Sequence, residues 1–145
     1  MKKVLGIIPA RLRSTRLPEK LLLSIGGKPL LYYTWRQALL ARSIDRVIIA
    51  TDSEKICRAA TAFGAEAVMT DPKHLTGSDR VAEAVHAFKE FIPKIVVNIQ
   101  GDEPLLPPAA IDACVMGLLQ NKDVSLSTVA VTLAFGLNSP FIILT

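Results

Sequence analysis

Short apolar runs alternate with longer amphipathic segments along most of the chain. Val and Ile dominate the runs at 4–9, 46–52 and 95–99, and shorter or weaker runs occur at 65–69 and 125–131. Such runs are typical of strands in a buried parallel sheet. Between them, apolar residues recur every three or four positions and predict helices at about 29–41, 53–63, 78–88 and 109–119.

Strands that alternate with helices need crossover connections, which favour a mainly parallel sheet with helices on both faces. The sequence therefore predicts the α/β class, and we expect Ser78 or Asp79 to cap the third helix. In open parallel sheets, ligands bind beyond the carboxyl ends of the strands. Three polar loops follow directly after predicted strands, at 10–20, 51–52 and 100–104.

The composition is that of an ordinary globular domain, with 50% hydrophobic and 21% charged residues among 145. No apolar run approaches the roughly 20 residues that span a bilayer, so membrane insertion is not expected. Cys57 and Cys114 fall in helical patterns and are interpreted as small core residues, which favours a cytoplasmic location. The net charge of +4 is mild, so its distribution matters more than its sum.

Most of the informative positive charge lies in the loop after the first predicted strand. Arg11, Arg13, Arg16 and Lys20 lie close together there, without an aromatic residue among them. Proteins that bind single-stranded nucleic acid usually add stacking rings to such charges, so no nucleic-acid partner is expected. The glycine patterns of dinucleotide-binding and P-loop proteins are also missing. Long cations and hydroxyls suit a compact polyphosphate, and the alternative is a solvated surface loop.

Two further motifs lie beyond strand ends or at a helix start. Asp102, beside Gly101 in the run 98–105, is a natural Mg²⁺ ligand, because Mg²⁺ prefers one or two carboxylates with phosphate oxygens and water. A capped strand-to-helix turn explains this run equally well. The segment 76–80 offers hydroxyls and Arg80 to a polar ring edge or a phosphate, although a plain helix cap is the favoured interpretation.

Taken together and in order, these motifs resemble those of the 3-deoxy-manno-octulosonate (Kdo) cytidylyltransferase family. The resemblance runs from residue 4 to about 131, and the run Gln-Gly-Asp-Glu-Pro-Leu at 100–105 is its most discriminating part. It implies a Rossmann-like three-layer sandwich of the nucleotide-diphospho-sugar transferase type. It also implies that residues 1–131 form a nucleotide-binding domain, incomplete in this chain.

The resemblance assigns roles to individual residues. It implies that Lys20, Arg16 and Asp102 are catalytic and that Asp102 binds Mg²⁺. It implies a set of nucleotide-binding residues, with the cations on the triphosphate and Ser78 and Arg80 near the cytosine or its ribose: Ala10, Arg11, Ser14, Arg16, Lys20, Thr51, Asp52, Ser78, Arg80 and Gln100. The implied reaction joins CTP and Kdo to give CMP-Kdo and pyrophosphate for lipopolysaccharide synthesis, and the complete enzyme is expected to be a homodimer.

The last segment, 132–145, does not match the family pattern. It contains no charged residue and ends apolar, and our preferred hypothesis is a frameshift, an early stop or a cloning artefact. Because family members are longer, we expect this truncated chain to be inactive alone. Two alternatives stay open: a non-catalytic nucleotide-binding remnant, or a cytidylyltransferase for another sugar acid such as sialic acid.

Overall fold

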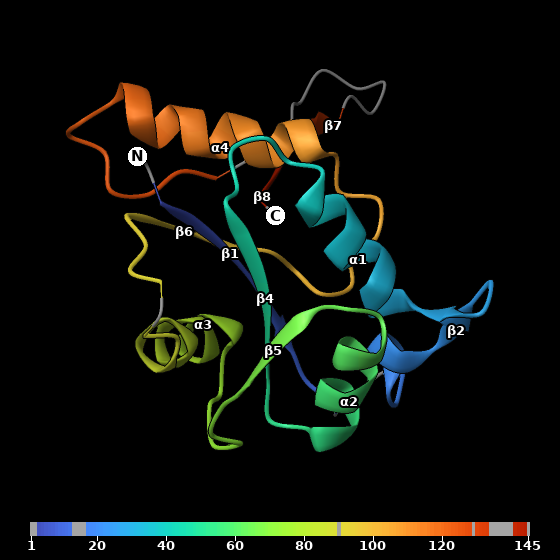
Figure 1. Cartoon of the computed structure of the whole chain (residues 1–145). Coiled ribbons are helices and arrows are strands. Elements are labelled where there is room, and N and C mark those ends of the chain that lie inside the picture. Colours follow the sequence, from blue (N-terminus) through green and yellow to red (C-terminus); the bar gives the residue numbers. More distant parts are fainter. Residues whose placement is uncertain (1–2, 13–16, 90, 129, 134–140, 145) are drawn as a thin grey trace.

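A parallel sheet forms the centre of the molecule, with strand order β5-β4-β1-β6. The computed structural model describes residues 3–12, 17–89, 91–128, 130–133 and 141–144. The sheet contains the four runs expected from the first hundred residues: β1 (Val4–Ala10), β4 (Arg46–Thr51), β5 (Glu66–Met69) and β6 (Ile95–Asn98). All three pairings are parallel, which confirms the predicted class (Figure 1).

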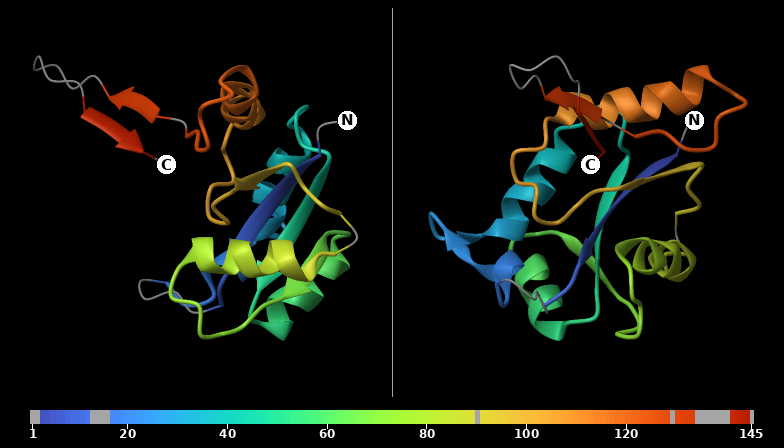
Figure 2. Two further views of the ribbon diagram at one scale, coloured as in Figure 1. Left: turned by 90° about the vertical axis from the view of Figure 1, so that its left-hand side faces the viewer. Right: turned by 180° about the vertical axis from the view of Figure 1, so that it is seen from behind.

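Helices cover both faces of this sheet. Those of the main layers are α1 (Leu30–Leu39), α2 (Glu54–Ala62), α3 (Gly77–Ala87) and α4 (Pro108–Gln120). Neighbouring strand residues point in opposite directions: Ile48 packs in one core cluster with α3, and Ile49 packs in the other with α1 and α2. The view from behind in Figure 2 shows α3 on one side of β4 and α1 and α2 on the other. The central strands β1 and β4 are therefore buried on both faces, as their apolar runs predicted, whereas β5 and β6 at the edges of the sheet are partly exposed.

Two small elements lie between β1 and α1 where no regular structure was predicted. A short 3-10 helix, η1 (Lys20–Leu22), is followed by a hairpin of β2 (Ser24–Ile25) and β3 (Lys28–Pro29). Gly26 and Gly27 form its turn, both with positive φ, a conformation that glycine adopts without strain. The hairpin leads the chain from the basic loop directly into α1.

The strand expected at 125–131 is wrong over residues 125–128, which form no regular structure. Leu126 is 83% exposed there, so this segment does not bury the apolar positions on which the prediction rested. Regular pairing begins later, where β7 (Ala130–Leu133) joins β8 (Phe141–Leu144) in a separate antiparallel pair. The boundary proposed at residue 131 stays a prediction. No helix in the described part of the chain is long and apolar enough to span a membrane.

Asp112 fastens α4 to the connection between α1 and β4. Its carboxylate accepts hydrogen bonds from the Ser43 N–H at 2.8 Å, the Ser43 hydroxyl at 2.6 Å and the Arg42 N–H at 3.3 Å. These donors, with the Ser43 hydroxyl first, hold the pKa of Asp112 below its usual 3.8. The ionised form of Asp112 therefore stabilises the fold.

We predict that Asp112→Asn lowers the free energy of unfolding by about 1 kcal/mol near pH 7, because the hydrogen bonds lost are charge-assisted but partly exposed. A lowered folded-state pKa means that this stabilisation is present above about pH 4 and is lost as the pH falls through the folded-state value. Urea denaturation near pH 7 and near pH 3 should show the gap between the two proteins narrowing on acidification. Asp123→Asn, at an exposed aspartate, is the matched control and should change neither value; a gap of constant size would contradict the assignment.

Candidate functional site

The carboxyl ends of the strands meet at one edge of the sheet, and a cleft lies there. Ala10 at the end of β1 is in register with Thr51 at the end of β4, and β6 ends alongside β1. The cleft has a volume of about 230 Å³. Its lining combines the basic loop, η1, the start of α3 and the loop after β6: Pro9, Arg11, Lys20, Leu21, Gly77, Gln100, Gly101 and Asp102. Four of the predicted site residues, Arg11, Lys20, Gln100 and Asp102, thus meet in one place.

Lys20 and Asp102 form an ion pair across the cleft. The Lys20 Nζ donates to the Asp102 Oδ2 at 2.8 Å, and the two side chains are 40% and 46% exposed. Lys20 begins η1, and the residue before it, Glu19, adopts a left-handed φ of 54°. Glu19 is held by its own N–H, which donates to the Leu12 carbonyl, and by the Lys55 ammonium. The turn at Glu19 therefore aims Lys20 into the cleft.

The loop that carries Asp102 is fixed from below. Gly101 is buried, and a Cβ on it would lie 3.3 Å from both the Leu21 side chain and the Pro9 carbonyl oxygen. The buried hydroxyl of Thr34 in α1 donates to the Gly101 carbonyl at 2.8 Å. A side chain at this position would require its neighbours, one of them a backbone carbonyl, to shift by a few tenths of an ångström, so Gly101 and Thr34 together set the position of Asp102. Thr34 was not expected at the site, because it carries no charge. Its sequence signal is that it is the one polar residue among the buried residues of α1.

Arg11 brings a positively charged guanidinium group to the same cleft. Its Nη2 is buried and has no hydrogen-bond partner among the described residues. Buried charged groups are normally paired, so an orphan guanidinium nitrogen at a cleft suits an anionic ligand. Ala10, the preceding residue, is fully buried at the end of β1; any contact that it makes with a ligand would come through its backbone.

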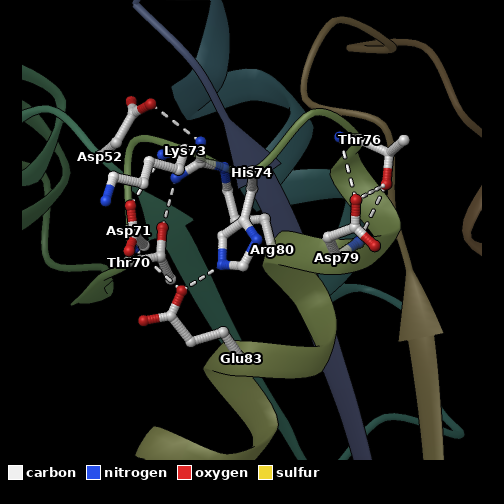
Figure 3. Close-up of polar contacts among 9 residues, drawn as sticks. All are labelled: Asp52, Thr70, Asp71, Lys73, His74, Thr76, Asp79, Arg80 and Glu83. Atoms are coloured by element: carbon white, nitrogen blue, oxygen red, sulfur yellow. Dashed lines mark hydrogen bonds and ion pairs between the residues drawn. The ribbon is translucent and has the colours of Figure 1, made fainter.

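The structure gives Arg80 a position that the sequence did not suggest. Its side chain is fully buried, its Nη2 donates to the Asp52 Oδ2 at 2.8 Å, and its Nη1 donates to the Thr70 hydroxyl. Figure 3 shows the guanidinium pointing from α3 toward the ends of β4 and β5. Arg80 therefore ties three elements together beneath the loops, while Asp52 remains partly exposed. Thr51 is buried beside it and accepts the Ser53 N–H.

The amino-terminal end of α3 lies next to the cleft, where Gly77 is part of the lining. The prediction that Ser78 or Asp79 caps this helix is wrong, because the cap is Thr76 (Figure 3). Thr76 and Asp79 form a reciprocal capping box, for which a Thr at the cap and an acidic residue three positions later are suited. The Thr76 hydroxyl is the main cause that lowers the pKa of Asp79, and nearby Arg11 contributes. Ser78 is exposed next to Gly77 but is not among the residues that line the cleft.

Glu83 holds the loop that leads into α3. Its carboxylate accepts the Asp71 N–H at 2.9 Å and pairs with the His74 ring (Figure 3). These contacts, with the Asp71 N–H first, lower the pKa of Glu83. Nothing in the sequence pattern distinguished Glu83 from other exposed helix positions, because its partners come from a loop whose path could not be predicted.

Two predicted site residues, Ser14 and Arg16, lie outside the described residues. The loop around them is described up to Leu12 and again from Leu17. Their assignment to the triphosphate stays a prediction.

Asp102 can bind a hard divalent cation if a bound polyphosphate supplies further oxygen ligands. No group of three or more His, Cys, Asp or Glu side chains gathers at a metal-binding distance within the described ranges. One carboxylate is a poor Mg²⁺ site by itself, but Mg²⁺ is commonly held by one or two carboxylates together with substrate phosphates. The side chains present therefore suit a metal that shares its ligands between Asp102 and a polyphosphate.

Sequence comparisons place this chain among the cytidylyltransferases. A family model described as "Cytidylyltransferase" matches residues 5–135. The 3-deoxy-manno-octulosonate cytidylyltransferase of Solibacter usitatus is 49% identical over 127 residues, which cover 88% of this chain and 49% of that protein. The protein of the same description from Zea mays is 44% identical over 131 residues, covering 90% of this chain and 44% of its own. The chain thus spans about half the length of the curated relatives that it matches.

Solved structures agree with these matches. The structure of CMP:2-keto-3-deoxy-manno-octonic acid synthetase complexed with CTP superposes with a TM-score of 0.80 at 36% identity, covering 85% of this chain and 50% of that one. A 4-diphosphocytidyl-2C-methyl-D-erythritol synthase, only 14% identical, shares the fold with a TM-score of 0.66. The chain therefore belongs to the cytidylyltransferase family, as a homologue of the 3-deoxy-manno-octulosonate cytidylyltransferases over part of their length.

Proposed function

We propose that this chain binds CTP with Mg²⁺ and serves the transfer of CMP from CTP to Kdo, which gives CMP-Kdo and pyrophosphate. The observation that carries the proposal is the cleft in which Arg11, Lys20, Gln100 and Asp102 meet. Its charges suit a triphosphate with a divalent cation. The choice of Kdo as the sugar substrate rests on the relatives described as 3-deoxy-manno-octulosonate cytidylyltransferases. Homodimer formation and a cytoplasmic location stay predictions.

The charges of the cleft suit nucleotidyl transfer by electrostatic stabilisation. In this reaction the anomeric hydroxyl of Kdo attacks the α-phosphorus in line while pyrophosphate leaves. Negative charge grows on the phosphate oxygens, so preplaced cations accelerate the step without a covalent nucleophile. Lys20 and Arg11 supply positive charge within the described part of the cleft, and Arg16 is the further cation proposed for the same task.

Asp102 is the residue proposed to hold Mg²⁺. When bound, the cation would neutralise phosphate charge and polarise the bonds at phosphorus. The carboxylate of Asp102 would fix one side of its coordination shell, while Gly101 and Thr34 fix the carboxylate through the loop backbone. Gln100, exposed beside them, has an amide that can donate to a phosphate or a sugar hydroxyl.

For the nucleoside end of CTP we propose the other loops at the same edge. Ser78 is exposed on the first turn of α3, where helix N–H groups favour anions and polar ring edges. Asp52 is partly exposed after β4, and Arg80 orients it from beneath. The resemblance implies that Arg80 lies near the cytosine or its ribose, but direct contact would require a route to a fully buried side chain. We therefore assign Arg80 a positioning role. The variant Arg80→Ala tests whether Arg80 also contacts the nucleotide directly.

A second candidate is nucleotide binding without turnover. It is favoured by the single proposed metal ligand in the described residues. Measuring CTP binding by calorimetry and CMP-Kdo formation separately distinguishes the two. Binding accompanied by turnover supports the transferase, and binding alone supports the second candidate. Offering sialic acid in parallel with Kdo tests the sugar.

We predict that Lys20→Ala weakens CTP binding in saturating Mg²⁺ by about tenfold or more, because a charge-assisted contact with phosphate is worth roughly 1.5–3 kcal/mol. If the chain turns over, the rate should also fall by about 10²–10³-fold, as expected for a lost transition-state contact. Isothermal titration calorimetry provides the measurement. Lys122→Ala, at an exposed lysine after α4, is the control, and equal affinity in both variants would remove Lys20 from the site.

We predict that Arg80→Ala lowers the free energy of unfolding by about 3 kcal/mol, since removing one partner of a buried pair leaves the other charge uncompensated. Chemical denaturation measures this loss, and Asp52→Asn should cost less because Asp52 is partly exposed. CTP affinity should fall only as far as the loops become less ordered. A variant of wild-type stability that no longer binds CTP would instead show that Arg80 contacts the nucleotide directly.

A further inference from the structure

The Lys20–Asp102 ion pair joins the residue proposed to bind the triphosphate to the residue proposed to bind Mg²⁺. Lys20 is the cation proposed for the phosphates, Asp102 is the carboxylate proposed for the metal, and each neutralises the other at 2.8 Å. Both side chains are less than half exposed and line the same cleft. A ligand that binds one residue of the pair therefore competes with the other residue for its charge.

A metal ion arriving alone meets an unfavourable site. It finds one carboxylate, and that carboxylate is already bonded to an ammonium group, with the Arg11 guanidinium in the same lining. Binding would place a divalent cation beside two positive charges and would release Lys20 without a new partner. Mg²⁺ also needs further oxygen ligands, and the described residues gather no group of three or more His, Cys, Asp or Glu side chains that could supply them.

A triphosphate arriving alone meets the opposite difficulty. Arg11 and Lys20 attract it, but drawing Lys20 onto the phosphates leaves Asp102 as an unpaired anion among phosphate oxygens. Like charges at such separations repel strongly, and the cleft screens them less than bulk water does. When both ligands bind, Lys20 pairs with phosphate and Asp102 with the metal, so neither residue is left uncompensated.

We propose that the Lys20–Asp102 pair couples the binding of metal and triphosphate, so that each ligand binds about tenfold or more tightly in the presence of the other. This inference rests on the proposed function and adds to it the origin of the coupling. The intact ion pair disfavours binding of the metal ion without the triphosphate and of the triphosphate without the metal ion. Occupation by free divalent cations or by metal-free nucleotide is thereby kept low.

The test uses single ligands, for which the proposal predicts gains rather than losses. Lys20→Met removes the competing cation but keeps an apolar side chain of similar length. This variant should bind Mn²⁺ in the absence of nucleotide about tenfold more tightly than the wild type. Electron paramagnetic resonance of the free Mn²⁺ measures the affinity. Asp102→Asn removes the competing anion, so metal-free CTP, titrated by calorimetry in a chelating buffer, should bind about tenfold more tightly. Lys122→Met serves as the control and should match the wild type in both titrations.

The outcomes separate this inference from the proposed function. Tighter single-ligand binding in both variants supports the coupling. If Lys20→Met holds Mn²⁺ no better than the wild type, or Asp102→Asn holds metal-free CTP no better, the pair does not couple the ligands and the inference is wrong. In that case unimpaired binding of CTP with metal to the wild type leaves the proposed function standing. No binding of CTP with saturating metal would overturn the proposed function and this inference together. Circular dichroism spectra confirm that the variants keep the fold.

Discussion

The parallel pairing of β1 between β4 and β6 is the constraint on which the rest of the structure depends. Parallel strands present all their carboxyl ends to one edge of the sheet, so three loops far apart in the sequence must meet there. The pairing also buries β1 on both faces, which requires a helix layer on each side. The cleft of Arg11, Lys20 and Asp102 is a consequence of this single arrangement.

Most of the fold could be predicted because its signals are local. The Val- and Ile-rich runs at β1 and β4 have the length and composition of buried strands. The apolar stripes expected in α2 and α3 include residues that are buried there, such as Ile56 and Val81. The hairpin after η1 and the cap of α3 were missed for different reasons. Two-residue strands carry little periodicity, and Thr76 is only one of several residues there able to cap a helix.

Four of the residues expected at the site line the cleft, but the contacts between their side chains could not be predicted from the sequence. Arg11, Lys20, Gln100 and Asp102 stood out because charged and polar side chains follow apolar strands. Their convergence agrees with that logic, but the ion pair between Lys20 and Asp102 depends on a left-handed Glu19 that no pattern indicated. Arg80 shows the limit most clearly: a basic residue at a helix start suggested a ligand, whereas burial turned it inward to Asp52 and Thr70.

The position of β1 has a consequence for the order in which the molecule is made. Val4 pairs with Ile95, so β1, which is synthesised before β6, must wait for β6 before the hydrogen bonds on its second edge can form. Contacts of such large sequence separation slow folding, because loop closure precedes any reward from pairing. A half-built sheet of β1, β4 and β5 would meanwhile present the edge of β1 to its surroundings, where pairing with other chains competes. The strand that organises the candidate cleft is thus also the one most dependent on prompt synthesis of β6.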